Sequence, residues 1–210
     1  TEKGLWNGIH LPGTPATVDP DALHKAVMAG WAHQFTARPE ERHRLGILFA
    51  ANLPPQARPG ADAGAATHVL VQGATAPVWD ADGPLTPLVD PFPYTMPALA
   101  AGDRVDLAVT VHPTRAEAAT HRHKPISDPT GIAEWFSRRL TSAVTIAPDQ
   151  VRIMRHGAPV IARRGFRIGL YTLTATGTVI DPDRVGVLVA GGVGRGKAYG
   201  AGLLRVRVAH

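Results

Sequence analysis

The sequence contains no cysteine among its 210 residues. A disulfide framework and a thiolate metal site are therefore both excluded. It also lacks any run of about eighteen consecutive apolar residues, the length that a membrane-spanning helix needs. Its first residues do not combine a basic segment with an apolar one, so we expect no secretory signal. These absences predict a cytoplasmic protein without a membrane partner.

The ten histidines do not form a recognisable metal site. No two of them have the spacing of metal ligands on a predicted helix. His121 and His123 stand in a polar stretch without an adjacent acidic residue or third histidine. The sequence therefore predicts neither a bound metal nor a cofactor.

Charge is distributed unevenly along the chain. Residues 1–97 carry 6 Lys and Arg against 9 Asp and Glu, a net charge of −3. Residues 98–210 carry 16 Lys and Arg against 8 Asp and Glu, a net charge of +8. A basic half of this kind fits a polyanionic partner such as nucleic acid. Charge alone leaves a solvated basic surface as the alternative.

The first half of the chain has the pattern of a β-α-β-β unit. Asp19 and Pro20 are a helix cap followed by a proline at the first helical position, which predicts a helix to about Gln34. The strand-like segments are Gly4–Leu11, Arg44–Asn52 and Thr67–Gln72. The proline-rich stretch 73–97 gives little support for a second helix. We therefore interpret residues 1–97 as a degenerate copy of the second half.

Residues 98–210 have the order β-α-β-β-α-β, which is the ferredoxin-like arrangement and places the chain in the α+β class. Helices are predicted from Asp128 to about Leu140 and from Asp181 to Val189. The predicted strands are Arg104–His112, Gln150–Arg155, Ala158–Arg163, Arg167–Thr176 and Gly202–Val208. His156 and Gly157 indicate a hairpin between the second and third of these strands. The polar stretch Ala116–Asp128 is expected to be a loop.

The most distinctive segment runs from Gly191 to Leu204. Its first twelve residues hold six glycines and two cations, Arg195 and Lys197. Gly191 to Lys197 has the spacing of a phosphate-binding Walker A loop, but Ala198 stands where a Ser or Thr would hold Mg²⁺. Too few residues follow for a nucleotide-binding domain. A loop that touches a nucleic-acid backbone is favoured, and a glycine-rich turn before a terminal strand is the alternative.

The segment from Gly192 to Leu204 resembles the C-terminal glycine-rich signature of the RAMP-type CRISPR proteins, and of the CasE family in particular. Four other segments resemble motifs of that family in the same order, and they are Leu23–Met28, Leu70–Gly73, His112–Arg115 and Arg122–Ile126. CasE is the endoribonuclease subunit of the type I-E Cascade complex. The resemblance implies two tandem ferredoxin-like domains. We expect residues 1–97 to carry a catalytic histidine, and residues 98–210 a basic hairpin and the glycine-rich loop.

The resemblance assigns the catalytic role to His24, which matches the family's histidine in the early helix. The implied reaction is metal-independent cleavage of CRISPR repeat RNA, in which a 2′-hydroxyl attacks the adjacent phosphorus and leaves a 2′,3′-cyclic phosphate. A histidine suits this step because it can take or give a proton near neutral pH. Asp21 stands where relatives commonly place a tyrosine, which is a departure from the family pattern.

The second half supplies the expected RNA contacts. Relatives use a basic hairpin to bind the stem of the repeat, and clustered arginines suit a helix that is read through its phosphates. The candidates are Arg152, Arg155, His156, Arg163, Arg164 and Arg167, together with Arg195 and Lys197 of the glycine-rich segment. The alternative is an exposed hairpin made soluble by its charges.

Three functional hypotheses follow. The chain is a repeat endoribonuclease that stays bound to its RNA stem-loop and to the other Cascade subunits. Alternatively, it is a non-catalytic RAMP subunit that only binds guide RNA, which Asp21 favours. The third hypothesis is an unrelated ferredoxin-like binding module, against which the +8 charge of the second half speaks.

Overall fold

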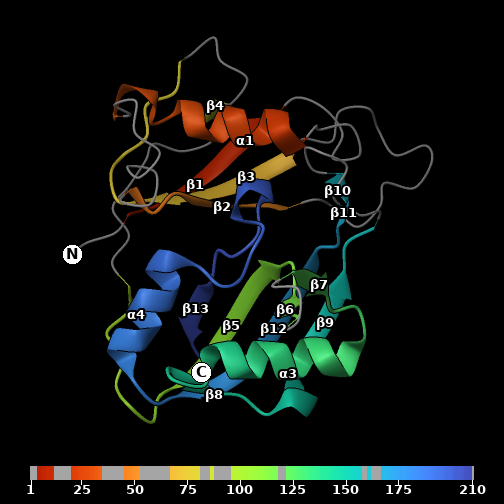
Figure 1. The fold of residues 1–210 in the computed structure, drawn as a ribbon. Coiled ribbons are helices and arrows are strands. Elements are labelled where there is room, and N and C mark those ends of the chain that lie inside the picture. Colours follow the sequence, from red (N-terminus) through yellow and green to blue (C-terminus); the bar gives the residue numbers. More distant parts are fainter. Residues whose placement is uncertain are drawn as a thin grey trace. The chain divides into compact units, whose positions relative to one another are not determined.

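The computed structural model describes residues 4–11, 20–34, 45–52, 67–80, 86–87, 96–117, 122–157, 160–161 and 167–209. The chain divides into two compact units. Unit 1 comprises Thr1–Thr95, Ile161–Phe166 and Ala198–Gly200, and unit 2 comprises Met96–Val160, Arg167–Lys197 and Ala201–His210. The fold is α+β, with two tandem ferredoxin-like units, so the predicted fold class is confirmed (Figure 1).

Unit 1 is a four-stranded antiparallel sheet with one described α-helix. Its elements are β1 (Gly4–Leu11), α1 (Pro20–Ala29), a 3₁₀ turn (Ala32–Gln34), β2 (Leu48–Asn52), β3 (Thr67–Gly73) and β4 (Thr86–Pro87). The strand order β2-β3-β1-β4 is that of a ferredoxin-like sheet. The predicted strand Gly4–Leu11 is confirmed. The predicted helix ends earlier than expected, at Ala29, because Gly30 follows and a 3₁₀ turn replaces the last residues.

The helical periodicity of α1 explains how it covers this sheet. Leu23, Ala26 and Val27 are buried, and they recur at the spacing of one helix face. They pack in one cluster with Val69 and Val71, alternate residues of β3 that point to the same side of the sheet. The predicted cap Asp19 lies outside the described residues.

Unit 2 has the same plan with two described α-helices. Its sheet strands and helices are β5 (Arg104–Val111), α3 (Pro129–Leu140), β8 (Val144–Thr145), β9 (Arg152–Arg155), β12 (Tyr171–Val179), α4 (Pro182–Gly191) and β13 (Arg205–Val208). The sheet has the order β13-β5-β12-β8, and β9 also pairs with β12. Both helices pack on the same face of the sheet and bury one continuous apolar core. Figure 1 shows α3 and α4 over that face.

Both predicted helix starts of unit 2 are confirmed. The Asp128 carboxylate accepts a hydrogen bond from Gly131 N at 2.6 Å, and Pro129 occupies the first turn of α3. The Asp181 carboxylate accepts one from Arg184 N at 3.1 Å at the start of α4. A short polar side chain before a proline was therefore enough to locate both helix starts from sequence.

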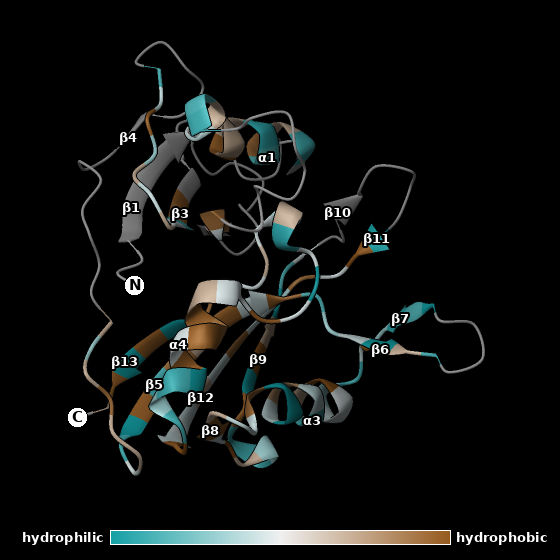
Figure 2. Cartoon of the chain, turned by 60° about the vertical axis from the view of Figure 1, so that its left-hand side comes forward, coloured by the Kyte–Doolittle hydropathy of each residue, from teal (hydrophilic) through white to brown (hydrophobic). Residues whose placement is uncertain are grey.

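Two predictions about unit 2 are wrong. The expected loop Ala116–Asp128 contains part of a hydrophilic hairpin, in which β6 (Thr114–Ala116) pairs with β7 (His123–Pro125) (Figure 2). Strands of this kind escape detection because they lack the alternating apolar residues by which a strand is recognised in sequence. Among the described residues, the expected hairpin at His156 and Gly157 is not found either, and β9 pairs with β12 instead. The next strand, β10 (Val160–Ile161), pairs with β11 (Arg167–Ile168).

The helices in the described part of the chain are too short and too polar to cross a bilayer. The longest of them, α3, has 12 residues.

Candidate functional site

His24 lies in the middle of α1 on the side that faces strand β2. Its side chain is half-buried, and its ring centroid lies 6.4 Å from that of Phe49 at an interplanar angle of 31°. Phe49 itself is 2% exposed. The contact with this buried ring limits the positions that the His24 imidazole can take.

The residues around His24 on the helix differ in exposure. Lys25 is exposed, whereas Asp21 is half-buried and lies one turn before His24 on the same side of α1. Asp21 is in the first helical turn, where its negative charge interacts favourably with the helix dipole. The resemblance described above leads us to expect a tyrosine at this position, whose hydroxyl is a hydrogen-bond donor, and Asp21 has a carboxyl group there instead.

Two tryptophans connect the C-terminal end of α1 with the segment that follows β3 through hydrogen bonds and ring packing. Trp31 Nε1 donates to Thr75 O at 3.0 Å, and Trp79 Nε1 donates to Ala26 O at 3.2 Å. Their rings meet edge to face, with centroids 5.8 Å apart. A Cβ on Gly73 would lie 2.5 Å from the Trp31 ring, so this approach requires glycine. The contact fixes the helix that carries His24.

The structure separates the predicted RNA-binding residues of β9. Arg152 is opposite Thr174 on the face of the sheet away from the helices, whereas Arg155 is opposite Tyr171, whose side chain belongs to the helix-covered core. The two arginines are three positions apart, and an odd spacing on a strand directs side chains to opposite faces. Both are exposed. They therefore cannot act as one cluster on a single face.

His156 joins a chain of polar side chains at the end of β9. Its Nε2 lies 2.6 Å from Thr172 Oγ1, which lies 3.1 Å from Thr110 Oγ1. Its backbone N donates to Leu170 O at 2.9 Å. Burial lowers the pKa of His156, so its neutral form is favoured at neutral pH. This residue fixes the end of β9 and contributes no positive charge of its own.

The remaining arginines of the predicted hairpin are partly described. Arg167 begins β11 and is exposed. Arg163 and Arg164 lie outside the described residues. The described arginines of this group are thus Arg152 and Arg155 on β9 and Arg167 on β11, and Arg152 lies on the face of the sheet away from the helices.

The glycine-rich segment is a folded loop anchored in unit 2. Val193 N donates to Gly202 O at 2.8 Å, and Gly202 N donates to Thr110 O at 2.7 Å. Val193 and Leu204 belong to the core. The glycines with positive φ are Gly192, Gly194, Gly196, Gly200 and Gly202. Most residues would be strained in that conformation, which explains the density of glycine.

The two cations of this loop have different environments. The Lys197 ammonium donates to Gly191 O at 2.5 Å, at the C-terminal end of α4, and so caps that helix. Partial desolvation lowers the pKa of Lys197. Arg195 has an exposed side chain, while its backbone forms an isolated antiparallel bridge with His112. Arg195 is therefore better placed than Lys197 to contact an anion.

Gly194→Ala is expected to destabilise unit 2 by roughly 2–4 kcal/mol, the summed cost of a positive φ and of overpacking. Gly194 has φ +78°, and a Cβ there would lie 2.9 Å from the Trp135 ring. Gly191→Ala is the matched control, since its Cβ would meet nothing within 4 Å. Urea unfolding of both variants measures the difference. Equal midpoints would mean that the loop is not packed on α3.

One group of basic residues escaped the sequence analysis. Arg205 and Arg207 alternate with Val206 and Val208 on β13, so both point to the helix-free face of the sheet. The alternation of arginine and valine is visible in the sequence. Which residues of other strands lie beside these arginines follows only from the strand order. The same holds for Arg104 at the start of β5.

Known proteins resemble this chain over most of its length. A family model described as "CRISPR associated protein" matches residues 11–207. The CRISPR-associated endoribonuclease Cse3 of Thermus thermophilus is 30% identical over 154 residues, which cover 66% of this chain and 72% of that relative.

Solved structures share the fold. A Thermus thermophilus Cse3 bound to an RNA representing a pre-cleavage complex matches with a TM-score of 0.73 and 25% identity, and the match covers 97% of this chain and 99% of the other. Cas6e from Escherichia coli K-12 matches with a TM-score of 0.68 and 18% identity over 98% of this chain and 99% of the other. The latter likeness concerns the fold alone.

Proposed function

Since the chain belongs to the CRISPR-associated protein family, we propose that it is an endoribonuclease that cleaves CRISPR repeat stem-loops in a precursor transcript. The observation that carries this proposal is the 30% identity to the endoribonuclease Cse3. The packed position of His24 on α1 supports it, because that ring can present a nitrogen to an RNA bound beside the helix. The product of each cleavage is a guide RNA.

The proposed reaction needs only the RNA and side chains of the protein. The 2′-hydroxyl next to the scissile phosphate loses its proton and attacks the phosphorus. The bond to the 5′-oxygen breaks, and that oxygen takes up a proton. The products are a 2′,3′-cyclic phosphate and a 5′-hydroxyl, and His24 takes or gives one of the two protons. Cationic groups near the phosphate stabilise the charge that builds up on its oxygens.

Asp21 supports a second candidate function. A carboxylate one turn from His24 repels a phosphodiester and supplies no proton at neutral pH. A chain with this feature could bind guide RNA without cleaving it. The two functions are distinguished by incubating the purified chain with the labelled repeat RNA of its own CRISPR array. Accumulation of discrete fragments supports the enzyme, and intact RNA in a stable complex supports the binding subunit.

The basic strands of unit 2 are proposed to hold the RNA stem. Replacing Arg155 and Arg167 by alanine is expected to weaken stem-loop binding and to lower the salt slope of affinity by about 0.7–0.9 for each phosphate that is no longer neutralised. Arg138 and Arg184 are exposed on α3 and α4 and provide the matched double control. Affinity across a salt series measures the slope. If the salt slope of affinity equals that of the control, Arg155 and Arg167 do not bind the stem, and Arg195 becomes the candidate for that contact.

The cellular setting follows from the substrate. We place the chain in the cytoplasm, where precursor transcripts are made. One related fold occurs in a CRISPR RNA-guided surveillance complex, with a TM-score of 0.63 and 16% identity. We propose accordingly that the chain keeps its cleaved stem-loop and joins the other subunits of such a complex.

A further inference from the structure

Arginines form ordered rows on the helix-free face of the unit 2 sheet. The register places Arg205 of β13 opposite Ala108 of β5, Ala108 opposite Thr174 of β12, and Thr174 opposite Arg152 of β9. One row therefore crosses four strands and begins and ends with an arginine. With neighbouring strands about 4.8 Å apart, the two arginine backbones are roughly 14 Å apart.

The small side chains inside this row make the face concave. Ala108 and Thr174 form a low floor between the longer arginines, and the resulting groove has a volume of about 860 Å³. Its charged lining comprises Arg104, Arg152, Arg205 and Arg207 against Asp106 and Asp149. The groove is thus basic, and all of its lining lies within unit 2.

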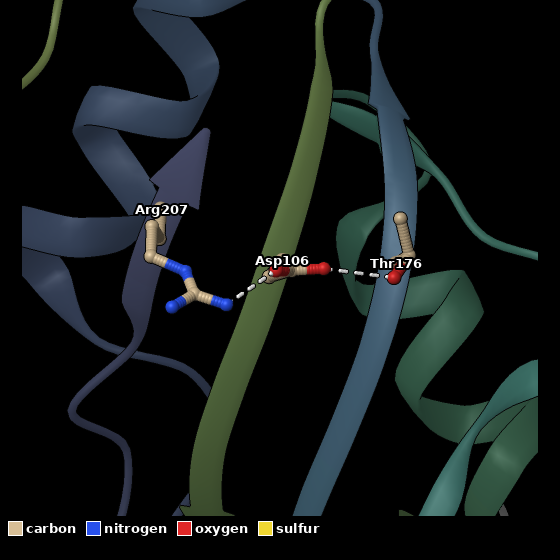
Figure 3. A network of polar contacts seen from close by, with 3 residues as sticks. All are labelled: Asp106, Thr176 and Arg207. Carbon is tan, nitrogen blue, oxygen red and sulfur yellow. Dashed lines mark hydrogen bonds and ion pairs between the residues drawn. The ribbon is translucent and has the colours of Figure 1, made fainter. Parts of the chain in front are cut away.

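The acidic residue of the floor is already neutralised. Asp106 accepts a hydrogen bond from Arg207 Nη2 at 2.8 Å and another from Thr176 Oγ1 at 2.9 Å (Figure 3). These two hydrogen bonds lower the pKa of Asp106, which favours its ionised form. Within the described residues, Arg152 and Arg205 form no ion pair. Two permanent positive charges therefore face an open groove without a protein partner in that part of the chain.

We propose that this groove binds the phosphate backbone of unpaired RNA that flanks the stem-loop. The inference rests on the proposed function and adds a second RNA site to it. Arginine guanidinium groups bind phosphate oxygens with two parallel hydrogen bonds, and a threonine hydroxyl such as that of Thr174 also donates to them. Among the described residues that line the groove there is no aromatic side chain, so the groove offers no platform on which bases could stack. The distance of roughly 14 Å between the backbones of Arg152 and Arg205 fits a few nucleotides of a single RNA strand. Duplex RNA, in contrast, is recognised over many base pairs.

Two substitutions test the groove without touching His24 or the residues proposed to bind the stem. Arg205→Glu reverses a charge at its edge, and Ala108→Glu places a carboxylate on its floor. Arg138→Glu is the matched control, because Arg138 is also exposed, lies on α3, and its change in net charge equals that of Arg205→Glu. The probes are the bare repeat stem-loop, the same stem-loop with a short uridine tail, and the uridine oligomer alone. Circular dichroism checks folding.

The wild-type chain and the control are expected to bind the tailed RNA roughly tenfold more tightly than the bare stem-loop, through a few added phosphate contacts. Both groove variants should bind tailed and bare RNA equally, and their salt slope on tailed RNA should fall by about 0.7 for each tail phosphate that is no longer neutralised. All chains should cleave the bare stem-loop at the same rate. A 4-thiouridine in the tail should crosslink to β5, β12 or β13.

Other outcomes overturn the inference. A tail that adds no affinity, or an equal weakening in Arg138→Glu, would show that the groove does not bind RNA. A polyglutamate peptide that binds the groove while the uridine oligomer does not would assign it to an acidic protein segment. Failure of the proposed function is separate, since it appears as an intact, unbound stem-loop. The uridine oligomer would still report on the groove in that case.

Discussion

His24→Ala is expected to reduce the single-turnover rate of repeat cleavage by roughly 10²–10⁴, the usual contribution of a general acid or base. Affinity for the stem-loop should change little, because the proposed stem contacts belong to unit 2 and His24 belongs to unit 1. The effect should therefore appear in the rate of the chemical step under saturating enzyme. Cleavage of a labelled repeat measures that rate, and filter binding measures affinity.

The control for His24 lies nine positions further along the same unit. His33 is exposed in the 3₁₀ turn Ala32–Gln34, so His33→Ala removes an imidazole without touching the packed position beside Phe49. This variant should cleave like the wild type. Because His24→Ala also removes a ring contact, thermal unfolding of both variants confirms that they are folded. A folded His24→Ala chain that cleaves at the wild-type rate would exclude His24 from catalysis.

A repeat RNA with one 2′-deoxy sugar at the scissile nucleotide is expected to bind normally and to remain intact. The attacking oxygen is absent from that substrate, so no residue of the protein can compensate for it. Cleavage of the unmodified RNA should persist in EDTA, since the proposed proton transfers use side chains and the 2′-hydroxyl alone. Gel analysis of both substrates in the same buffer measures the effect. Cleavage of the deoxy substrate would show that water or another nucleophile attacks the phosphorus.

Local signals in the sequence predicted much of the fold. The caps Asp128 and Asp181 located two helix starts, because a side-chain acceptor and a following proline act within a few residues. Alternating apolar residues located β5, because this pattern is also set by neighbouring residues. The partners of β9 and β10 could not be found this way. Strand pairing depends on contacts far along the chain, and a turn signal at His156 was outweighed by the long, half-buried strand β12.

For the candidate site too, local sequence patterns identified some residues, and contacts distant in sequence were needed for the others. His24 was found through the resemblance of its helix, whereas the contact between Trp31 and Trp79 that fixes the helix joins residues far apart in sequence. Because side chains alternate between the two faces of a strand, the odd spacing of Arg152 and Arg155 was enough to predict from sequence that they lie on opposite faces. The row that links Arg152 to Arg205 needed the register of four strands. Charge composition identified the basic half of the chain, but only the strand register shows which face of its sheet carries these arginines.

The mass of the upstream cleavage fragment tests the proposed reaction most directly. The purified chain is incubated in EDTA with the repeat RNA of its own array, and the fragment's 3′ end is identified by mass spectrometry. Attack by the 2′-hydroxyl predicts a 2′,3′-cyclic phosphate, one water lighter than the linear phosphate, and its absence with His24→Ala. A 3′-hydroxyl end, or fragments that appear only when a divalent metal is added, would contradict a metal-independent nuclease that relies on His24.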